Sequence, residues 1–233
     1  MKKIFMSVAC VLLLSGAGKS VEPGSYTDLA EKSHDCKSKV YPYREGGTCA
    51  SGEYVQYEIR RITDFGERPV FSPDGRKVAF VDREFGDAYE LSLDTGDIEC
   101  ITCGYEHEGF LRVHYMKDGD LLLLGPKRHS TDFISRVFDT GFWWMPADRS
   151  SGPRWIGGEH FEGVAVSRES RKIAFSKTWL DTPLMVPSRM YVAELTEDGR
   201  IVDKRVVFRS MNIIEAQDFL PGDKGLTMAR YTP

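Results

Sequence analysis

The sequence predicts an all-β protein, and three observations carry that prediction. A motif made of an alternating strand, a turn and a second strand occurs four times between residues 67 and 228. Its turns are rich in Gly, Asp and Pro, which favour tight hairpins. The copies are spaced 44, 51 and 53 residues apart. Repeats of this length, with several short strands in each, are typical of the blades of a β-propeller.

The clearest copy covers residues 69–80, Pro-Val-Phe-Ser-Pro-Asp-Gly-Arg-Lys-Val-Ala-Phe. Proline presets one turn position and glycine tolerates the positive φ that ends the turn. Apolar residues stand seven and nine positions after a shared anchor in every copy. This common phase predicts the same hairpin four times, with the anchors Phe71, Tyr115, Val166 and Phe219.

Two more strands complete each repeat unit. Residues 88–93 alternate and lead through a turn to a strand at 98–102, and residues 190–195 and 206–208 form the matching pair in the third unit. Four strands to a unit is the composition of a propeller blade. We therefore expect a partial propeller over residues 57–233, with blades at roughly 57–103, 104–157 and 158–210 and an incomplete blade at 211–233.

The repeat resembles a known family at residues 71–80 and 89–96, the second of which reads Tyr-Glu-Leu-Ser-Leu-Asp-Thr-Gly. These segments look like the WD40-like (PD40) repeat of TolB-type propellers. The same repeat occurs in propellers of prolyl-oligopeptidase-like and tricorn-like peptidases and of some polysaccharide lyases. The resemblance covers roughly residues 59–233 and implies the fold. It implies no single function, because such relatives bind proteins, gate peptidases or cleave sugars.

Closure of the ring leads to two further expectations. Residues 57–63 look like an outermost strand without preceding partners, which in a closed propeller completes the last blade. The sequence ends near the second strand of the fourth unit, whereas propellers close with about four to eight blades. An open arc would expose unpaired strand edges. We expect a fragment of a longer propeller, and the alternative is a short chain that closes by oligomerising.

The first 18 residues differ from the rest in composition. Two lysines precede an apolar run at 4–14, and small residues follow at 15–18. A mostly apolar run of eleven residues is too short to span a bilayer as a helix, so this pattern predicts a cleaved signal peptide and a periplasmic or secreted protein. Cys10 lies inside the apolar run, a position that argues against lipidation.

Four cysteines remain after such cleavage, and an even number in an oxidising compartment favours disulfides. Cys36 and Cys49 lie in an irregular segment, 19–56, where a bridge between them would close a loop. Cys100 and Cys103 have CxxC spacing, but positions i and i+3 of a strand are about 10 Å apart, beyond disulfide reach. A bridge between them requires the chain to turn there, and otherwise the pairing crosses to the first two cysteines. A redox or metal-binding role for Cys100 and Cys103 is the less favoured interpretation, because no βαβ pattern and no second CxxC are present.

The charge balance and the known short motifs exclude several functions. A net charge of -4 provides no basic surface for nucleic acid. No nucleophile elbow, phosphate-binding loop, dinucleotide fingerprint or zinc-binding helix motif occurs. No catalytic residue is assigned, and no membrane span is expected after signal removal.

Carboxylates recur at the expected mouth of the channel. The first strand of each blade lines the channel of a propeller, and three of the four units have a Glu four positions before the anchor. Histidines and a further Glu occupy the same entering loops. Such a set could bind a divalent cation or a basic group. The alternative interpretation is that these acids are solvated loop residues or cap neighbouring backbone amides. The candidates are Glu67, Glu162, Glu215, His160, His107 and Glu108.

Two long insertions on the same face mix aromatic, apolar and basic residues. They cover residues 126–138 and 177–187. Loops of this composition on a rigid scaffold favour recognition, although their aromatic rings could instead pack on their own blades. The recognition candidates are Arg128, His129, Phe133 and Trp179.

The run Phe-Trp-Trp-Met at residues 142–145 lacks the alternation of a strand with one wet face. Packing between blades buries both faces of a strand, so core is the favoured interpretation. A platform for stacking sugars is the alternative.

These observations favour an exported, non-catalytic binding module that recognises a protein, peptide or glycan with its channel-mouth loops. The first alternative is a propeller enzyme of sugar-lyase or hydrolase type, with a metal held by Glu162, His160, Glu215 and Glu67. The second is a propeller that gates a peptidase or hydrolase domain encoded beyond residue 233. A divalent cation is the one cofactor considered.

Overall fold

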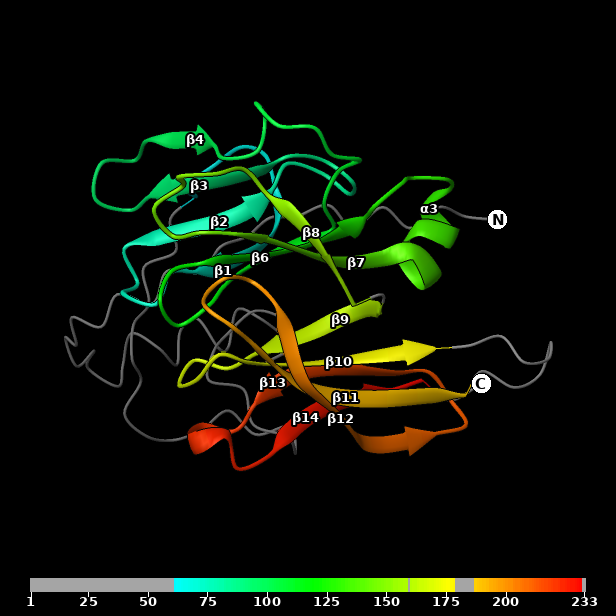
Figure 1. Cartoon of the computed structure of the whole chain (residues 1–233). Helices are drawn as coiled ribbons and strands as arrows, with labels where there is room; N and C mark the ends of the chain where they lie inside the picture. The colour runs from blue at the N-terminus through cyan, green and yellow to red at the C-terminus, as the bar shows by residue number, and fades with distance from the viewer. Residues whose placement is uncertain (1–60, 159, 179–186, 232–233) are drawn as a thin grey trace, which may run out of the picture. The chain divides into compact units, whose positions relative to one another are not determined.

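The computed structural model describes residues 61–158, 160–178 and 187–231. In these residues the chain forms three four-stranded antiparallel sheets and one two-stranded sheet, each made of consecutive strands (Figure 1). Each sheet is a meander, which is the topology of a propeller blade. The predicted fold class, an all-β partial propeller, is confirmed.

The first blade contains β1 (Glu67–Phe71), β2 (Lys77–Val81), β3 (Ala88–Ser92) and β4 (Ile98–Cys100). The second contains β5 (Arg112–Tyr115), β6 (Leu121–Pro126), β7 (Thr140–Met145) and β8 (Arg154–Gly157). The third contains β9 (Phe161–Val166), β10 (Lys172–Thr178), β11 (Ser188–Leu195) and β12 (Ile201–Ser210). The fourth sheet consists of β13 (Ile214–Phe219) and β14 (Leu226–Arg230).

Short helices interrupt two of the connections. Between β6 and β7 the chain forms α3 (Asp132–Ile134), followed by the π-helix η1 (Ser135–Asp139). Thr131 caps α3 by accepting a hydrogen bond from the backbone N–H of Ile134. The 3₁₀ turn η2 (Pro221–Asp223) joins β13 to β14. In the part of the chain that the structure describes, no helix is both long enough and apolar enough to cross a membrane.

Several sequence predictions fall on residues outside this description. They are the signal peptide at 1–18, the irregular segment 19–56 with its two cysteines, and residues 57–60 of the expected outer strand. The last residues of that expected strand, 61–63, are described and are not in a strand.

The turn between β1 and β2 shows why the repeat motif forms a hairpin. Ser72 Oγ donates to Asp74 Oδ1 at 2.6 Å, and the same carboxylate oxygen accepts from the backbone N–H of Arg76 at 3.1 Å. Gly75 has φ 71°, which favours glycine, and its N–H donates to the carbonyl of Ser72. The Ser-Pro-Asp-Gly sequence thus satisfies its own turn and sets the register of the two strands.

Strand β6 lies at the centre of the hydrophobic core. Its four leucines, residues 121–124, are fully buried. Leu121 and Leu123 pack with side chains of the first blade, whereas Leu122 and Leu124 pack with side chains of the third. Full burial of each leucine contributes about 1.5–3 kcal/mol. A strand buried on both faces needs no polar alternation, which explains its uninterrupted apolar run.

The aromatic run on β7 is part of the same two interfaces. Trp143 and Met145 belong to the cluster between the first and second blades, where Trp143 meets Trp155 with ring centroids 5.5 Å apart. Phe142 belongs to the next cluster and contacts Phe175 edge-on at 5.1 Å. The core interpretation of residues 142–145 is therefore confirmed.

Charged side chains join adjacent blades at the end where the β1–β2, β5–β6 and β9–β10 turns lie, which we name the turn end. Arg171 reaches from the third blade to the carboxylates of Asp118 and Asp120 in the second, with the Asp120 contact at 2.9 Å. Its remaining donors reach the carbonyls of Leu195 and Thr196 at 2.6 and 2.9 Å. Every arm of this buried guanidinium group therefore has a partner.

Glu90 joins the first and second blades in the same way. It accepts from Lys77 in its own blade at 2.6 Å, and from Tyr115 and Arg149 of the second blade at 2.5 and 3.0 Å. Burial alone would raise the pKa of Glu90, but its hydrogen bonds from Lys77 and Tyr115 and the charge of Arg149 hold that pKa below its usual value. Glu90 thus stays ionised and bridges the two blades.

Asp223 joins the fourth sheet to the third blade. Its two oxygens accept from Ser167 Oγ and Ser170 Oγ, each at 2.6 Å, and Lys172 Nζ lies 3.3 Å away. Burial opposes the charge, yet these donors hold the pKa of Asp223 below its usual value. The turn end therefore has a satisfied ionic bridge at each of the three blade interfaces.

Candidate functional site

The opposite end of the blades, where the innermost strands begin, brings three arginines together around one carboxylate. We name it the mouth end. Arg68 and Arg112 lie at the starts of β1 and β5, Glu162 lies at the start of β9, and Arg136 comes from η1 in the first long insertion. We call these four residues the arginine cluster.

Glu162 is the centre of this cluster. Its Oε1 lies 3.3 Å from Arg68 Nη2 and 3.5 Å from Arg112 Nη2, and its Oε2 lies 3.5 Å from Arg136 Nε. The Glu162 side chain is 15% exposed. One mostly buried carboxylate is thus shared by three guanidinium groups from three segments of the chain.

Other contacts balance the three cations only in part. Arg136 also pairs with Glu84, and Arg68 donates to the carbonyl of Leu111 at 2.8 Å. The buried Nε donors of Arg112 and Arg136 have no hydrogen-bond partner among the described residues. Buried donors without an acceptor are costly and occur mainly where a ligand or an ordered water supplies the missing acceptor.

A β-bulge directs Arg68 into the cluster. The pairing of β1 with β2 shifts register between Glu67 and Val70, and Arg68 within that shift has φ 56°. A non-glycine residue in this left-handed region is strained, at a cost of about 1–3 kcal/mol, and such strain is concentrated at functional sites. The pairing of β9 with β10 shifts in the same way beside Glu162. Bulges re-aim side chains at the ends of strands.

Both carboxylates and cations act on Arg68. Burial lowers the pKa of Arg68, Glu162 opposes this change, and the neighbouring cations Arg112 and Arg136 add to it. The carboxylate of Glu67 also stabilises the Arg68 cation. With Glu84 on Arg136, three carboxylates therefore act on the three arginines.

Glu215, from the fourth sheet, extends this region. Its Oε2 accepts a hydrogen bond from Tyr231 Oη at 2.5 Å, which together with partial burial raises the pKa of Tyr231 to about 12. Any side chain at Gly163 would place its Cβ 1.8 Å from Glu215 Cγ. Glycine is therefore required beside Glu162 for this carboxylate to lie against the backbone of β9.

Two histidines, the buried His160 and the half-buried His114, lie behind the cluster. Burial, with Arg112 and His160 nearby, lowers the pKa of His114 to about 3. Burial also lowers the pKa of His160 to about 4, although its hydrogen bond to the carbonyl of Phe161 opposes the change. The His160 ring stacks on Phe142 at 4.2 Å. Both rings are neutral at physiological pH, and the Nε2 of each has no partner among the described residues.

A groove of about 410 Å³ runs along the innermost strands of all four sheets. None of the four arginine-cluster residues lines it, and its lining extends from the middle of these strands to the turn end, at Pro73, Lys117 and Arg168. Apolar and cationic groups share its wall, among them Phe71, Tyr115, Lys117 and Arg168. The volume suits a short extended segment of a ligand.

The predicted acidic residues reach the mouth end but do not form a metal-binding set. Glu162 forms ion pairs with arginines, and Glu215 accepts a hydrogen bond from Tyr231. The carboxylate of Glu67 stabilises the charge of Arg68. In the described residues, the only group of three or more His, Cys, Asp or Glu side chains close enough to hold a metal ion contains none of the six predicted residues. A cation at this site thus stays a prediction without a gathered ligand set.

The entering loop before β5 carries the two remaining acidic-site candidates. His107 Nε2 lies 3.1 Å from Asp87 Oδ1, and its ring lies 4.5 Å from that of Phe110. Glu108 is exposed. This loop therefore pairs with the start of β3 and adds no carboxylate contact to the arginine cluster.

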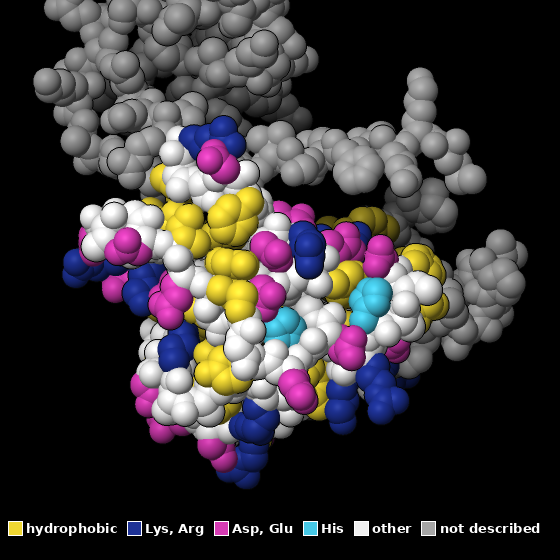
Figure 2. Space-filling view, turned by 90° about the horizontal axis from the view of Figure 1, so that it is seen from above, with side chains coloured by type: hydrophobic (Ala, Val, Ile, Leu, Met, Phe, Trp, Pro, Cys, Tyr) yellow, Lys and Arg dark blue, Asp and Glu magenta, His cyan; other side chains and the backbone are white. Residues whose placement is uncertain are grey.

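The recognition candidates in the first insertion lie at the surface. Phe133 is 65% exposed and touches Phe138 edge-on at 6.2 Å, and Arg128 is exposed. The Nε2 of His129 lies 3.2 Å from Asp132 Oδ1, and its ring contacts that of Phe85 in the first blade at 4.7 Å. Trp179 lies outside the described residues. Figure 2 shows hydrophobic, acidic and histidine side chains interspersed on one face of the molecule.

Sequence reasoning missed the arginines. Arg68 and Arg112 each stand three positions before the anchor of their unit, next to the predicted carboxylate position. The same alignment that identified the glutamates could therefore have found these two. Arg136 lies in an irregular insertion without a repeat phase, and no sequence signal places it beside Glu162.

The CxxC cysteines form a disulfide. Strand β4 ends at Cys100 and the chain turns at once, so the Cα atoms of Cys100 and Cys103 are 5.7 Å apart. This separation lies in the range that a disulfide requires. The chain therefore turns after Cys100, as a bridge between these two cysteines requires.

Comparisons with known proteins identify no family. No protein-family model and no curated protein matches the chain. Its solved structural neighbours include a protein of Agrobacterium tumefaciens assigned as TolB, at 17% identity over 66% of this chain and 53% of that one, with a TM-score of 0.45. Kuenenia stuttgartiensis hydrazine synthase is 12% identical over 78% and 47%, with a TM-score of 0.47.

A puromycin hydrolase is 19% identical over 73% of this chain and 28% of that one, with a TM-score of 0.48. The chain therefore spans about half the length of the first two proteins and about a quarter of the third. Function has to be argued from the site itself.

Proposed function

We propose that this propeller is a non-catalytic binding module and that its mouth end recognises a carboxylate on a protein or peptide ligand. The observation that carries the proposal is the convergence of Arg68, Arg112 and Arg136. The buried Nε of Arg112 has no hydrogen-bond partner among the described residues, and that of Arg136 has only the ion pair with Glu162 at 3.5 Å. Guanidinium groups match carboxylates in shape and charge, and they bind them through paired hydrogen bonds.

Glu162 prepares this site for a ligand. By attracting all three arginines in the free protein, it holds their long side chains in one place and reduces the ordering needed on binding. The incoming carboxylate would accept a hydrogen bond from the unpartnered Nε of Arg112 and would share Arg136 with Glu162 and Glu84.

The groove along the innermost strands, between the mouth end and the turn end, would take the remainder of a peptide. Its wall combines the aromatic side chains of Phe71 and Tyr115 with the cations of Lys117 and Arg168. Apolar side chains of a peptide would contact the rings, while further acidic groups would meet the cations. Loops and strand ends of a rigid propeller are a common location for such recognition.

An exported location fits this function. The sequence predicts a signal peptide, the Cys100–Cys103 disulfide is the kind of bond that persists outside the cytosol, and the repeat resembles that of TolB-type propellers. The ligand is then a periplasmic or extracellular protein. The two catalytic alternatives, a channel-mouth metal enzyme and a gating propeller, stay predictions.

The test uses short synthetic peptides that carry one glutamate or a free C-terminal carboxylate, each beside its amide counterpart. Binding to the full chain is measured by calorimetry or fluorescence anisotropy. A charge-assisted hydrogen bond contributes about 1.5–3 kcal/mol, so the amide counterpart should bind about tenfold more weakly or worse. Added salt should weaken the acidic peptide more than its amide.

Variants locate the site. Arg112→Gln and Arg136→Gln should each reduce binding of the acidic peptide by about tenfold. Arg76→Gln, an exposed arginine paired with Asp94 at the turn end, is the matched control and should bind as the wild type does. Equal affinity for acid and amide peptides would refute carboxylate recognition. Binding of uronic-acid oligomers in place of peptides would keep the site and change the ligand class to glycan.

A further inference from the structure

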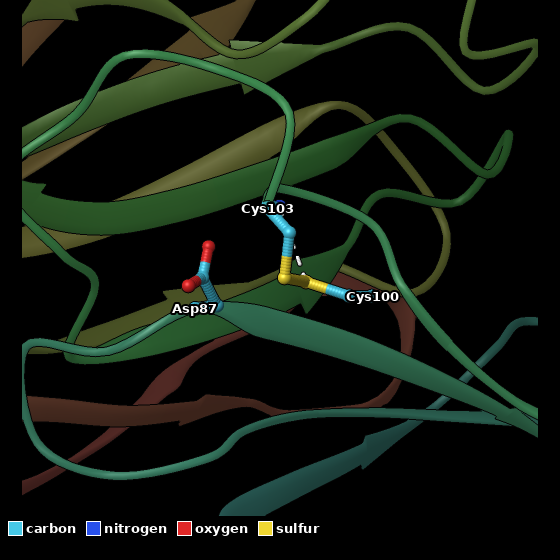
Figure 3. A group of neighbouring side chains, drawn as sticks. All are labelled: Asp87, Cys100 and Cys103. Atoms are coloured by element: carbon cyan, nitrogen blue, oxygen red, sulfur yellow. Dashed lines mark hydrogen bonds between the residues drawn. A yellow bond between two sulfur atoms is a disulfide. The ribbon is translucent and has the colours of Figure 1, made fainter.

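The CxxC disulfide lies beside a carboxylate. Asp87 directly precedes β3, Cys100 ends β4, and Cys103 follows in the turn. One carboxylate oxygen of Asp87 and the two sulfurs all lie within 4.8 Å of one another. Figure 3 shows the Asp87 carboxylate next to the sulfur pair. Two sulfurs and a carboxylate are a donor set that zinc accepts when the cysteines are thiolates.

Hydrogen-bond donors already face both sulfurs. The backbone N–H of Cys103 donates to Cys100 Sγ at 3.1 Å, and Tyr89 Oη lies 3.8 Å from Cys103 Sγ. Ionised acceptors receive stronger hydrogen bonds than neutral ones, so these donors would stabilise a thiolate far more than a disulfide sulfur. The local backbone is therefore arranged to support the reduced, metal-bound form.

Two neighbours fix the orientation of Asp87. Its Oδ1 accepts from Thr102 Oγ1 at 2.8 Å and lies 3.1 Å from His107 Nε2. His107 Nδ1 accepts from the backbone N–H of Gly109 at 2.9 Å, which places the ring proton of the neutral histidine on Nε2. His107 thus donates to Asp87 and orients it rather than binding metal itself, and Asp87 Oδ2 keeps its lone pairs for a ligand. Such support is common around metal sites.

We propose that reduction of the Cys100–Cys103 disulfide opens a zinc site formed by Cys100, Cys103 and Asp87. A dithiol reductant transfers two electrons and two protons to the S–S bond, and the reductant becomes a disulfide. The two cysteine thiols then release two protons as two sulfur–zinc bonds form, and the fourth zinc position is left to water. Zinc with three protein ligands and one exchangeable position is a known coordination pattern.

The two sulfurs differ in access. Cys103 is exposed and Cys100 is half-buried. An external thiolate therefore attacks Cys103, and Cys100 leaves as the sulfur whose charge is stabilised by the Cys103 N–H. Oxidation closes the site again, so zinc binding reports the redox state of the surroundings.

The experiment uses the full chain with Cys10, Cys36 and Cys49 replaced by serine, so that only the CxxC pair can bind. The protein is reduced with a dithiol, desalted under nitrogen and titrated with zinc against a chromophoric chelator. Cobalt(II) in a parallel titration reports thiolate ligation through charge-transfer absorption. We expect one equivalent of metal with the reduced chain and none with the oxidised chain. Circular dichroism checks that both forms keep the sheet structure.

Matched variants test the carboxylate. Asp87→Asn keeps an acceptor for Thr102 and His107 but removes the charge, and should weaken zinc binding at least tenfold. His107→Phe should weaken it about 10–100-fold, which is typical of a residue that orients a ligand. Asp97→Asn, an exposed acid in the β3–β4 turn, is the control and should leave the affinity unchanged. The proposal is overturned if the reduced chain binds no zinc, or if Asp87→Asn and Asp97→Asn bind it equally well.

Discussion

At the turn end, each charge between two blades has partners from both, whereas at the mouth end three arginines share Glu162. Arg171 has four acceptors, while the Nε of Arg112 has no hydrogen-bond partner among the described residues and the Nε of Arg136 has only the 3.5 Å ion pair with Glu162. The two ends belong to the same strands and differ in what their charges do. Charged groups whose hydrogen-bond partners are all present stabilise the contact between blades, whereas a buried donor without an acceptor is available to a ligand.

Backbone strain occurs at both ends of the blades. Arg68, with φ 56° inside a bulge, lies at the mouth end. Arg149 and Asp223, which join blades at the turn end, have φ 57° and 53°. Strain at a residue that could be relieved by glycine is retained where the side chain has a function. At the turn end that function is to hold blades together.

The largest expected effect of a single substitution is at the turn end. Arg171→Ala leaves the carboxylates of Asp118 and Asp120 without their cation, and Asp120 is buried. Removing one partner of a buried ion pair costs about 3–5 kcal/mol of unfolding free energy. Chemical denaturation should show this loss, together with weakened contact between the second and third blades.

The control for this prediction is Arg200→Ala, which removes an exposed pair with Asp198 and should leave the unfolding free energy close to that of the wild type. An equal loss in both variants would mean that the turn-end bridges do not hold the blades together.

The second expected effect is on the pH dependence of stability, through the two histidines behind the cluster. The pKa of His114 is about 3 and that of His160 about 4 in the folded protein, against an ordinary value of 6.5. Both groups bind protons more readily when the chain unfolds, so their contribution is complete above pH 6.5 and declines as the pH falls toward 4. From pH 7 to pH 5 each contributes a loss of roughly 2 kcal/mol.

Thermal melts between pH 7 and pH 5 test this expectation. The double variant His114→Gln and His160→Gln should have a flatter pH profile than the wild type. His129→Asn, on the exposed insertion, serves as the control. Identical profiles for the wild type and the double variant would show that other groups control the loss of stability.

The fold could be predicted because its signal is periodic. Four in-phase hairpin motifs identified the blades, and the apolar run at residues 142–145 indicated strands buried on both faces. In contrast, the partners of single charged residues depend on contacts between blades. Arg171 and Asp118 are 53 residues apart in the chain, and nothing local in the sequence connects them.

The sequence alignment identified some residues of the candidate site and missed others. The alignment put Glu67, Glu162 and Glu215 at the mouth, and these residues do lie there. The expectation of a cation site did not allow for Arg68, whose side chain reaches Glu162 from within a bulge. A bulge is an irregularity of pairing, which no strand periodicity reveals. Arg136 lies in an insertion outside the repeat, so the alignment could not predict its contact with Glu162 either.

The smallest expected effect on stability is at Arg68 itself, and it sharpens the comparison of the two ends. Arg68→Gly removes the strain of a side chain at φ 56° while losing the contact with Glu162 and the hydrogen bond to Leu111. Relief of about 1–2 kcal/mol offsets these losses, so the unfolding free energy should stay within about 1 kcal/mol of the wild type. Acidic-peptide binding should nevertheless fall about tenfold, because one of the three guanidinium groups is gone. A loss of stability as large as that of Arg171→Ala, with peptide binding intact, would mean that the mouth-end arginines serve the fold, as the turn-end bridges do.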